Sequence, residues 1–147
     1  MSDPYHLQRF VRAQDLNFES AREELRRGRK TTHWIWYVFP QAEGLGHSST
    51  SQNFAIKSKA EALAYLAHPV LGPRLRECTD IVNALDGLSA HQIFGSPDDM
   101  KFRSSMTLFH TVSPEIAVFN EALQKYFGGE LDPRTLDLMR ANPSAWF

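Results

Sequence analysis

Four prolines in this sequence each follow a residue that commonly caps a helix. A side-chain oxygen at the N-cap accepts a hydrogen bond from a free backbone N–H, and a proline at the next position loses nothing, because its missing N–H would have no helical partner. A further helix start is the capping box that runs from Ser58 to Glu61. This punctuation predicts a mainly α-helical chain. The four pairs are Asp3-Pro4, Ser96-Pro97, Ser113-Pro114 and Asp132-Pro133.

Apolar spacing and helix-end signals divide most of the chain into a compact single-domain bundle of about six to eight helices, some short, over residues 1–147. Residues 32–39 have strand propensity, but we favour a short buried helix there because a lone strand would lack a partner. Residues 40–53 are expected to form a loop. The expected helices are Pro4–Gln14, Phe18–Arg27, Lys59–Ala67, one that starts at Pro73 and is followed by Gly87, Ala90–Phe94, Pro97–His110, Pro114–Phe127 and a short one that starts at Pro133.

The charge and composition exclude several classes of protein. The formal net charge is −1, so no large uniform positive field is available to bind a nucleic-acid backbone. A hydrophobic fraction of 42% is too high for a disordered chain. No apolar window is long enough to span a bilayer, and the first residues lack a signal-peptide pattern. We therefore expect a soluble, cytoplasmic monomer that binds neither nucleic acid nor membranes.

The common catalytic signatures are missing from the sequence. The six histidines include no pair at i,i+4 spacing, and the single cysteine leaves a tetrahedral zinc site without ligands, so we expect no metal and no cofactor. Cys78 lies on an apolar helical stripe and is expected to be a small buried hydrophobe. No catalytic residue is assigned.

The most informative segment places large aromatic residues directly before a glycine-rich, hydroxyl-rich stretch. Aromatic rings can stack a nucleobase, while glycines and hydroxyls can let a backbone approach and bind an anion or a sugar. The alternative is that the tryptophans fill the core and the Gly-Leu-Gly sequence is only a turn. The candidate ligand-binding residues of this segment are His33, Trp34, Trp36, Gln41, Gly44, Gly46, Ser48 and Ser51.

A second candidate surface lies on the expected helix Pro97–His110. Asp98, Lys101 and Ser105 form a polar stripe beside its apolar one. Lys101 and Ser105 are candidate ligand-binding residues that would face the glycine loop, residues 41–51, across a cleft. The alternative is that Asp98 and Lys101 form only a surface ion pair.

Several phrases resemble a bacterial family catalogued as domain of unknown function 1810, whose members have often been labelled calpastatin. The phrases are RFVRAQ, EELRRGRKTTHWIWYVFPQAEGLGHSSTS, EALAYLAHPVLGPRLRECT and IFGSPDDMKFRSSMTLF. The resemblance implies a compact, mainly α-helical domain with no established activity. The calpastatin label conflicts with the residues, because that inhibitor is disordered and repetitive whereas this chain is aromatic-rich and free of repeats. The family is also distantly similar to helical proteins that act on ADP-ribose and related N-glycosides.

Two functions remain open at this point. One is a site for a nucleotide, an ADP-ribose-like molecule or another anion between the glycine loop and the Lys101 helix, with possible N-glycoside hydrolysis by a carboxylate such as Glu43, Asp98 or Asp99. The other is a non-catalytic helical interaction module. An open pocket lined by both segments would favour the first function, and mutual burial without a cavity would favour the second.

Overall fold

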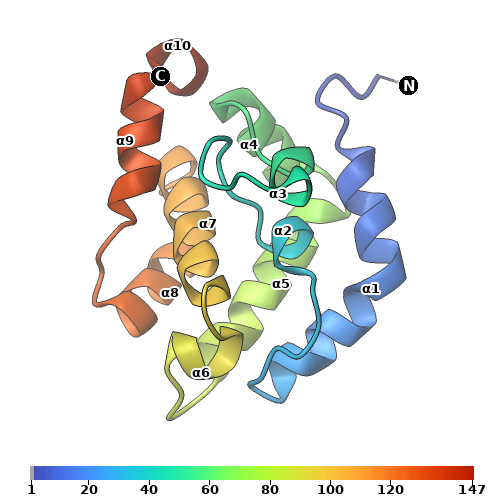
Figure 1. Cartoon of the computed structure of the whole chain (residues 1–147), viewed down its shortest axis with the longest axis vertical. Helices are drawn as coiled ribbons and strands as arrows, with labels where there is room; N and C mark the ends of the chain where they lie inside the picture. Colours follow the sequence, from blue (N-terminus) through green and yellow to red (C-terminus); the bar gives the residue numbers. More distant parts are fainter. Residues whose placement is uncertain (1) are drawn as a thin grey trace.

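The structure is a computed structural model that describes residues 2–147, and these residues form ten helices without a named strand. Helix α1 runs along one side of the molecule, α9 and α10 lie on the opposite side, and α5 and α7 pass between them (Figure 1). The helices are α1 (Gln8–Arg26), α2 (Ile35–Val38), α3 (Ser49–Asn53), α4 (Lys59–Ala67), α5 (Leu71–Ala84), α6 (Ala90–Phe94), α7 (Asp98–Val112), α8 (Ala117–Phe127), α9 (Pro133–Ala141) and α10 (Pro143–Trp146).

Helix α7 lies in the core and packs against α8, α6, α9, α4 and α2. Phe102, which is fully buried on this helix, stacks on Phe94 with ring centroids 4.5 Å apart and meets Phe39 edge-on at 5.0 Å. The aromatic rings therefore join α6, α7 and the end of α2 in one apolar cluster. No helix among residues 2–147 has the length and apolar character needed to cross a bilayer.

Local signals predicted two helices to the residue. Helix α4 begins after Ser58, whose hydroxyl accepts a hydrogen bond from the Glu61 N–H, and helix α6 carries a complete capping box between Ser89 and Gln92. Residues 32–39 contain the short buried helix α2, as expected. The buried thiol of Cys78 also confirms its expected place in the core, where burial raises its pKa to about 12.

The two helices expected at Pro4–Gln14 and Phe18–Arg27 are wrong, because α1 continues through both of them. Residues 15–17 contain no glycine or proline to end it, and their side chains face solvent, including Leu16 at 84% exposure. The helix also begins later than expected. The Asp3 carboxylate accepts hydrogen bonds from the N–H groups of Leu7 and Gln8, so it caps a helix that starts at Gln8.

Other boundaries also differ from the expected ones, and helix α5 begins at Leu71, two residues before the expected start at Pro73. Only Asp132-Pro133 acts as the predicted cap and first residue, with the Asp132 carboxylate accepting from the Thr135 N–H. Helices α7 and α8 begin at Asp98 and Ala117, one and three residues after the prolines expected to start them. The expected loop at residues 40–53 contains helix α3, which Ser48 caps by accepting from the Ser51 N–H.

A buried carboxylate holds the segment between α1 and α2. Glu24 is 3% exposed, and its oxygens accept from the backbone N–H groups of Thr31 and Thr32, the Thr32 hydroxyl and the Trp34 indole. Burial raises the pKa of Glu24, but these hydrogen bonds outweigh it and lower the pKa to about 2. Trp34, 1% exposed, is fixed in the core by this contact.

We predict that Glu24→Gln lowers the free energy of unfolding by about 1–3 kcal/mol at neutral pH, because one amide oxygen cannot replace two charged acceptors. The folded pKa of Glu24 is depressed below its ordinary value of 4.5. The stability difference from wild type should therefore be complete above about pH 4.5 and shrink as the pH falls towards about 2. Urea unfolding at several pH values measures it, with the exposed Glu23→Gln as the control; equal pH profiles for wild type and Glu24→Gln would contradict the prediction.

Candidate functional site

A cavity of about 580 Å³ opens between the turn that precedes α1 and the segment that joins α3 to α4. This volume lies in the range of small-molecule sites. Two stretches of chain that are distant in sequence, residues 4–9 and 52–61, form its walls. The lining residues are Pro4, Tyr5, His6, Arg9, Gln52, Asn53, Phe54, Lys57, Ser58 and Glu61.

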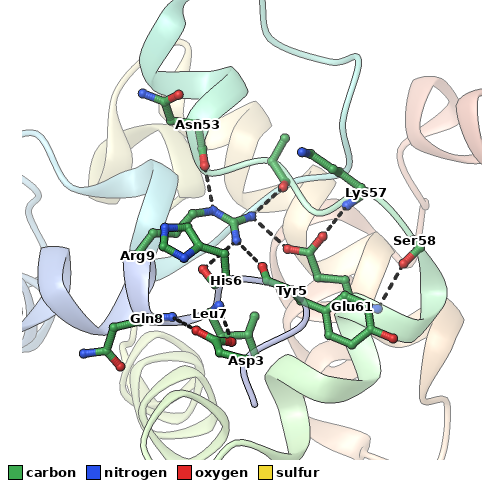
Figure 2. A network of polar contacts seen from close by, with 11 residues as sticks. Asp3, Tyr5, His6, Leu7, Gln8, Arg9, Asn53, Lys57, Ser58 and Glu61 are labelled. Carbon is green, nitrogen blue, oxygen red and sulfur yellow. Dashed lines mark hydrogen bonds and ion pairs between the residues drawn. The ribbon is translucent and has the colours of Figure 1, made fainter. Parts of the chain in front are cut away.

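Arg9 joins these stretches through every N–H group of its guanidinium, as Figure 2 shows. Its Nη1 donates to the carbonyl oxygens of Tyr5 and His6, at 2.7 and 2.9 Å. Its Nε donates to the Asn53 carbonyl at 2.7 Å. Its Nη2 donates to the Ala55 carbonyl at 3.0 Å and to Glu61 Oε2 at 2.8 Å. All five donors are used, so Arg9 is a structural centre of the pocket and has no N–H left for a ligand.

The Glu61 carboxylate is also fully engaged. It is 3% exposed; Oε2 pairs with Arg9, and Oε1 accepts from the Lys57 backbone N–H at 3.0 Å. The Glu61 side chain therefore closes the first turn of α4 while Ser58 caps the same turn (Figure 2). Each Glu61 oxygen therefore accepts one hydrogen bond from within the protein, and burial leaves little of the carboxylate accessible to a ligand.

The wall before α1 has an uncommon backbone geometry. His6 has a φ of +53°, in the left-handed region that side chains other than glycine rarely adopt. Arg9 holds this geometry through the carbonyls of Tyr5 and His6, and Asp3 closes the other side of the turn. The backbone N–H groups of Leu7 and Gln8 lower the pKa of the Asp3 carboxyl. The turn is thus fixed from both ends, with the His6 side chain exposed at the pocket.

The remaining ionisable side chains of the pocket are basic. Lys57 and His6 are both exposed, and within residues 2–147 neither the Lys57 ammonium nor the His6 imidazole has a hydrogen-bond or ion-pair partner. The charges of Arg9 and Glu61 offset each other at 2.8 Å. The uncompensated charge of the pocket is therefore positive.

A second, much smaller cavity of about 20 Å³ lies beside the glycine loop. Five of the residues predicted from the sequence meet there: Trp36, Gln41, Gly44, Gly46 and Ser51. The space admits one water-sized group and cannot hold a nucleotide. Gln52 and Phe54 line both cavities, so the two cavities are neighbours, although no residue of the glycine loop lines the larger one.

Trp36 connects the glycine loop with α7. The Lys101 ammonium lies 5.1 Å from the centre of the Trp36 ring, a cation–π arrangement. Lys101 is also 3.5 Å from Asp98, which pairs with Lys30 at 2.7 Å. The indole N–H of Trp36 is buried and has no acceptor among the described residues. Trp36 therefore lies between the cavity at the glycine loop and Lys101 of α7. Neither of the two cavities described above is lined by both the loop and α7, so neither is the open cleft expected between these two segments.

The other predicted residues are placed apart from any cavity described above. Trp34 is buried and bonded to Glu24, so its ring has no open face for stacking. Ser105 is fully buried on α7, and its hydroxyl has no partner within residues 2–147. Ser48 caps α3, and His33 is exposed beside α2.

The glycines of the loop are explained by packing within the chain. A Cβ on Gly44 would collide with the Leu138 side chain of α9, and one on Gly46 would lie 2.5 Å from the Ser51 side chain. Gly44 also has a φ of +104°. Both positions therefore require glycine before any ligand is considered.

The family of this chain follows from comparison with known proteins. The family model described as "Protein of unknown function (DUF1810)" matches residues 4–139, and the chain belongs to this family. It is similar to the conserved hypothetical protein Rv1873 from Mycobacterium tuberculosis, whose crystal structure has 51% sequence identity and a TM-score of 0.91. That match covers 92% of this chain and 97% of the other. No curated protein matches the chain.

We predict that Arg9→Ala lowers the free energy of unfolding by about 3–5 kcal/mol, because it leaves the buried Glu61 carboxylate without its partner. Arg9→Lys should recover less than half of the loss, since an ammonium cannot bond all five acceptors. Urea denaturation measures both effects. Arg12→Ala, an exposed change on the same helix, is the control and should alter stability by less than about 0.5 kcal/mol. Wild-type stability in Arg9→Ala would show that the network is dispensable.

Proposed function

We propose that this protein binds a small anionic molecule in the pocket between the turn before α1 and the α3–α4 segment. The observation that carries the proposal is the imbalance of free charge. The carboxylate that lines the pocket, Glu61, has both oxygens engaged, whereas the ammonium of Lys57 and the imidazole of His6 have no partner within residues 2–147. A cavity that offers an unpaired ammonium and an imidazole N–H, and whose carboxylate is bonded within the protein, favours an anion.

The construction of the pocket also supports binding. Five hydrogen bonds from Arg9 fix both walls without a ligand. A site that is already ordered does not have to immobilise its own walls when a ligand arrives, which reduces the entropic cost of association. The fixed left-handed backbone at His6 is consistent with this role.

The glycine loop, Trp36 and Lys101 have a secondary part in this proposal. Their small cavity shares Gln52 and Phe54 with the main pocket, so a ligand that extends past Phe54 would reach the loop. Hydrolysis of an N-glycoside requires a carboxylate or an equivalent group at the scissile bond. Because Glu61 is buried and both of its oxygens already accept hydrogen bonds from the protein, we propose binding without hydrolysis, and an interaction module is the alternative.

The test is a titration of the full chain with inorganic phosphate, ribose 5-phosphate, adenosine 5′-monophosphate (AMP) and ADP-ribose, measured by calorimetry and thermal shift. At least one of these anions should bind and raise the melting temperature. Lys57→Ala should weaken that binding by about fivefold to tenfold, because it removes a charge from the pocket wall.

Lys59→Ala is the matched control. Lys59 begins α4, is exposed and lies outside the pocket lining, so its removal changes the net charge equally. Equal losses in the two variants would mean that the anion responds only to overall charge, and the proposed site would be wrong. Failure of every anion in the panel to bind would favour the interaction module.

A further inference from the structure

The main pocket, which is the cavity of about 580 Å³, combines the basic side chains of Lys57 and His6 with two aromatic walls. Tyr5 and Phe54 both line it and both are half-buried. Phe54 is held from behind by Phe10 and Tyr37, with ring centroids 5.7 and 5.3 Å away. The backbone of Tyr5 is fixed by Arg9, through the carbonyl that accepts from Nη1. The Phe54 ring, which is packed in this way, can receive a flat ring with little loss of side-chain freedom, and the Tyr5 ring extends from a fixed backbone into the same pocket.

Polar groups stand next to these rings. Asn53 precedes Phe54 and lines the same pocket; its carbonyl is taken by Arg9, while its side-chain amide has no partner within residues 2–147. In Figure 2 the amide of Asn53 points away from the Arg9 network. A side-chain amide presents a donor and an acceptor together, which is the pattern that matches the polar edge of a heterocyclic base.

On the proposed function, we infer that the anion is a phosphomonoester that carries a flat heterocyclic ring, a nucleoside monophosphate in size and chemistry. Its ring lies against Tyr5 and Phe54, and its phosphate is bound by the Lys57 ammonium and the His6 imidazole from the two walls of the pocket. The cavity of about 580 Å³ accommodates one such molecule. The ring of the ligand would cover the aromatic side chains of Tyr5 and Phe54, whereas an anion without a ring would leave them exposed to solvent.

The inference is tested by dividing the ligand into its parts. The affinities of AMP, ribose 5-phosphate and adenosine are measured by calorimetry on the full chain at fixed salt concentration. AMP should bind about tenfold more tightly than ribose 5-phosphate, which corresponds to one stacked base. Adenosine, which lacks the phosphate, should also bind more weakly than AMP.

Substitutions then locate the ring contact. Tyr5→Leu should remove most of the advantage of AMP and leave the affinity for ribose 5-phosphate unchanged, whereas Tyr5→Phe should retain the advantage. Thermal melting confirms that both variants remain folded. Trp36→Leu is the competing variant, because Trp36 is half-buried beside the smaller cavity.

The outcomes separate this inference from the proposal beneath it. Equal binding of AMP and ribose 5-phosphate would overturn the ring contact and leave the anion site in place. Loss of the AMP advantage in Trp36→Leu but not in Tyr5→Leu would move the ring to the glycine loop and overturn the assignment to Tyr5. Absence of binding by AMP, ribose 5-phosphate and the other anions would overturn both.

Discussion

Because helix α7 is buried on nearly every side, most of its hydroxyl groups find acceptors inside the protein, with Ser105 as the exception. The hydroxyls of Ser104, Thr107 and Thr111 each donate to the backbone carbonyl four residues earlier. Thr107 also accepts from the backbone N–H of Asp132, whose carboxylate lies 2.8 Å from the Ser104 hydroxyl. Small hydroxyl residues thus let α7 remain central without unpaired polar groups at these positions, and they fix the start of α9 against it.

Helix α1 holds the segments that connect the other helices, as α7 holds the core. Three side chains of this one helix, those of Arg9, Gln14 and Glu24, form hydrogen bonds with backbone groups outside the long helices. Arg9 binds the segments around α3, Gln14 donates to the Tyr37 carbonyl at 2.6 Å, and Glu24 holds residues 31–34. Because α1 is continuous, these three anchors have fixed spacing. Two separate helices, as the sequence suggested, would have left the pocket wall and the Trp34 segment free to move independently.

The parts of the fold that could be predicted are those determined by residues close together in the sequence. Ser58 with Glu61 and Ser89 with Gln92 are caps within three residues, and both helices were placed correctly. The main pocket was not predicted, because Arg9 meets its partners across 44 to 52 residues of sequence. A lone arginine in an amphipathic helix gives no local sign of such contacts. The only available signal was its place in a phrase, RFVRAQ, that resembles the family.

The glycine loop shows why a motif can be distinctive without being the site itself. Gly44 allows the loop to lie against Leu138 of α9, and the Leu45 carbonyl accepts from Arg134 on the same helix at 3.3 Å. The same loop joins the rest of the chain through the bridge between Ala42 and Ile56. Its sequence is therefore constrained by contacts on two sides. Since Ile56 precedes Lys57, the bridge sets the path of the chain into the main pocket, and the loop contributes to that pocket chiefly by positioning its wall.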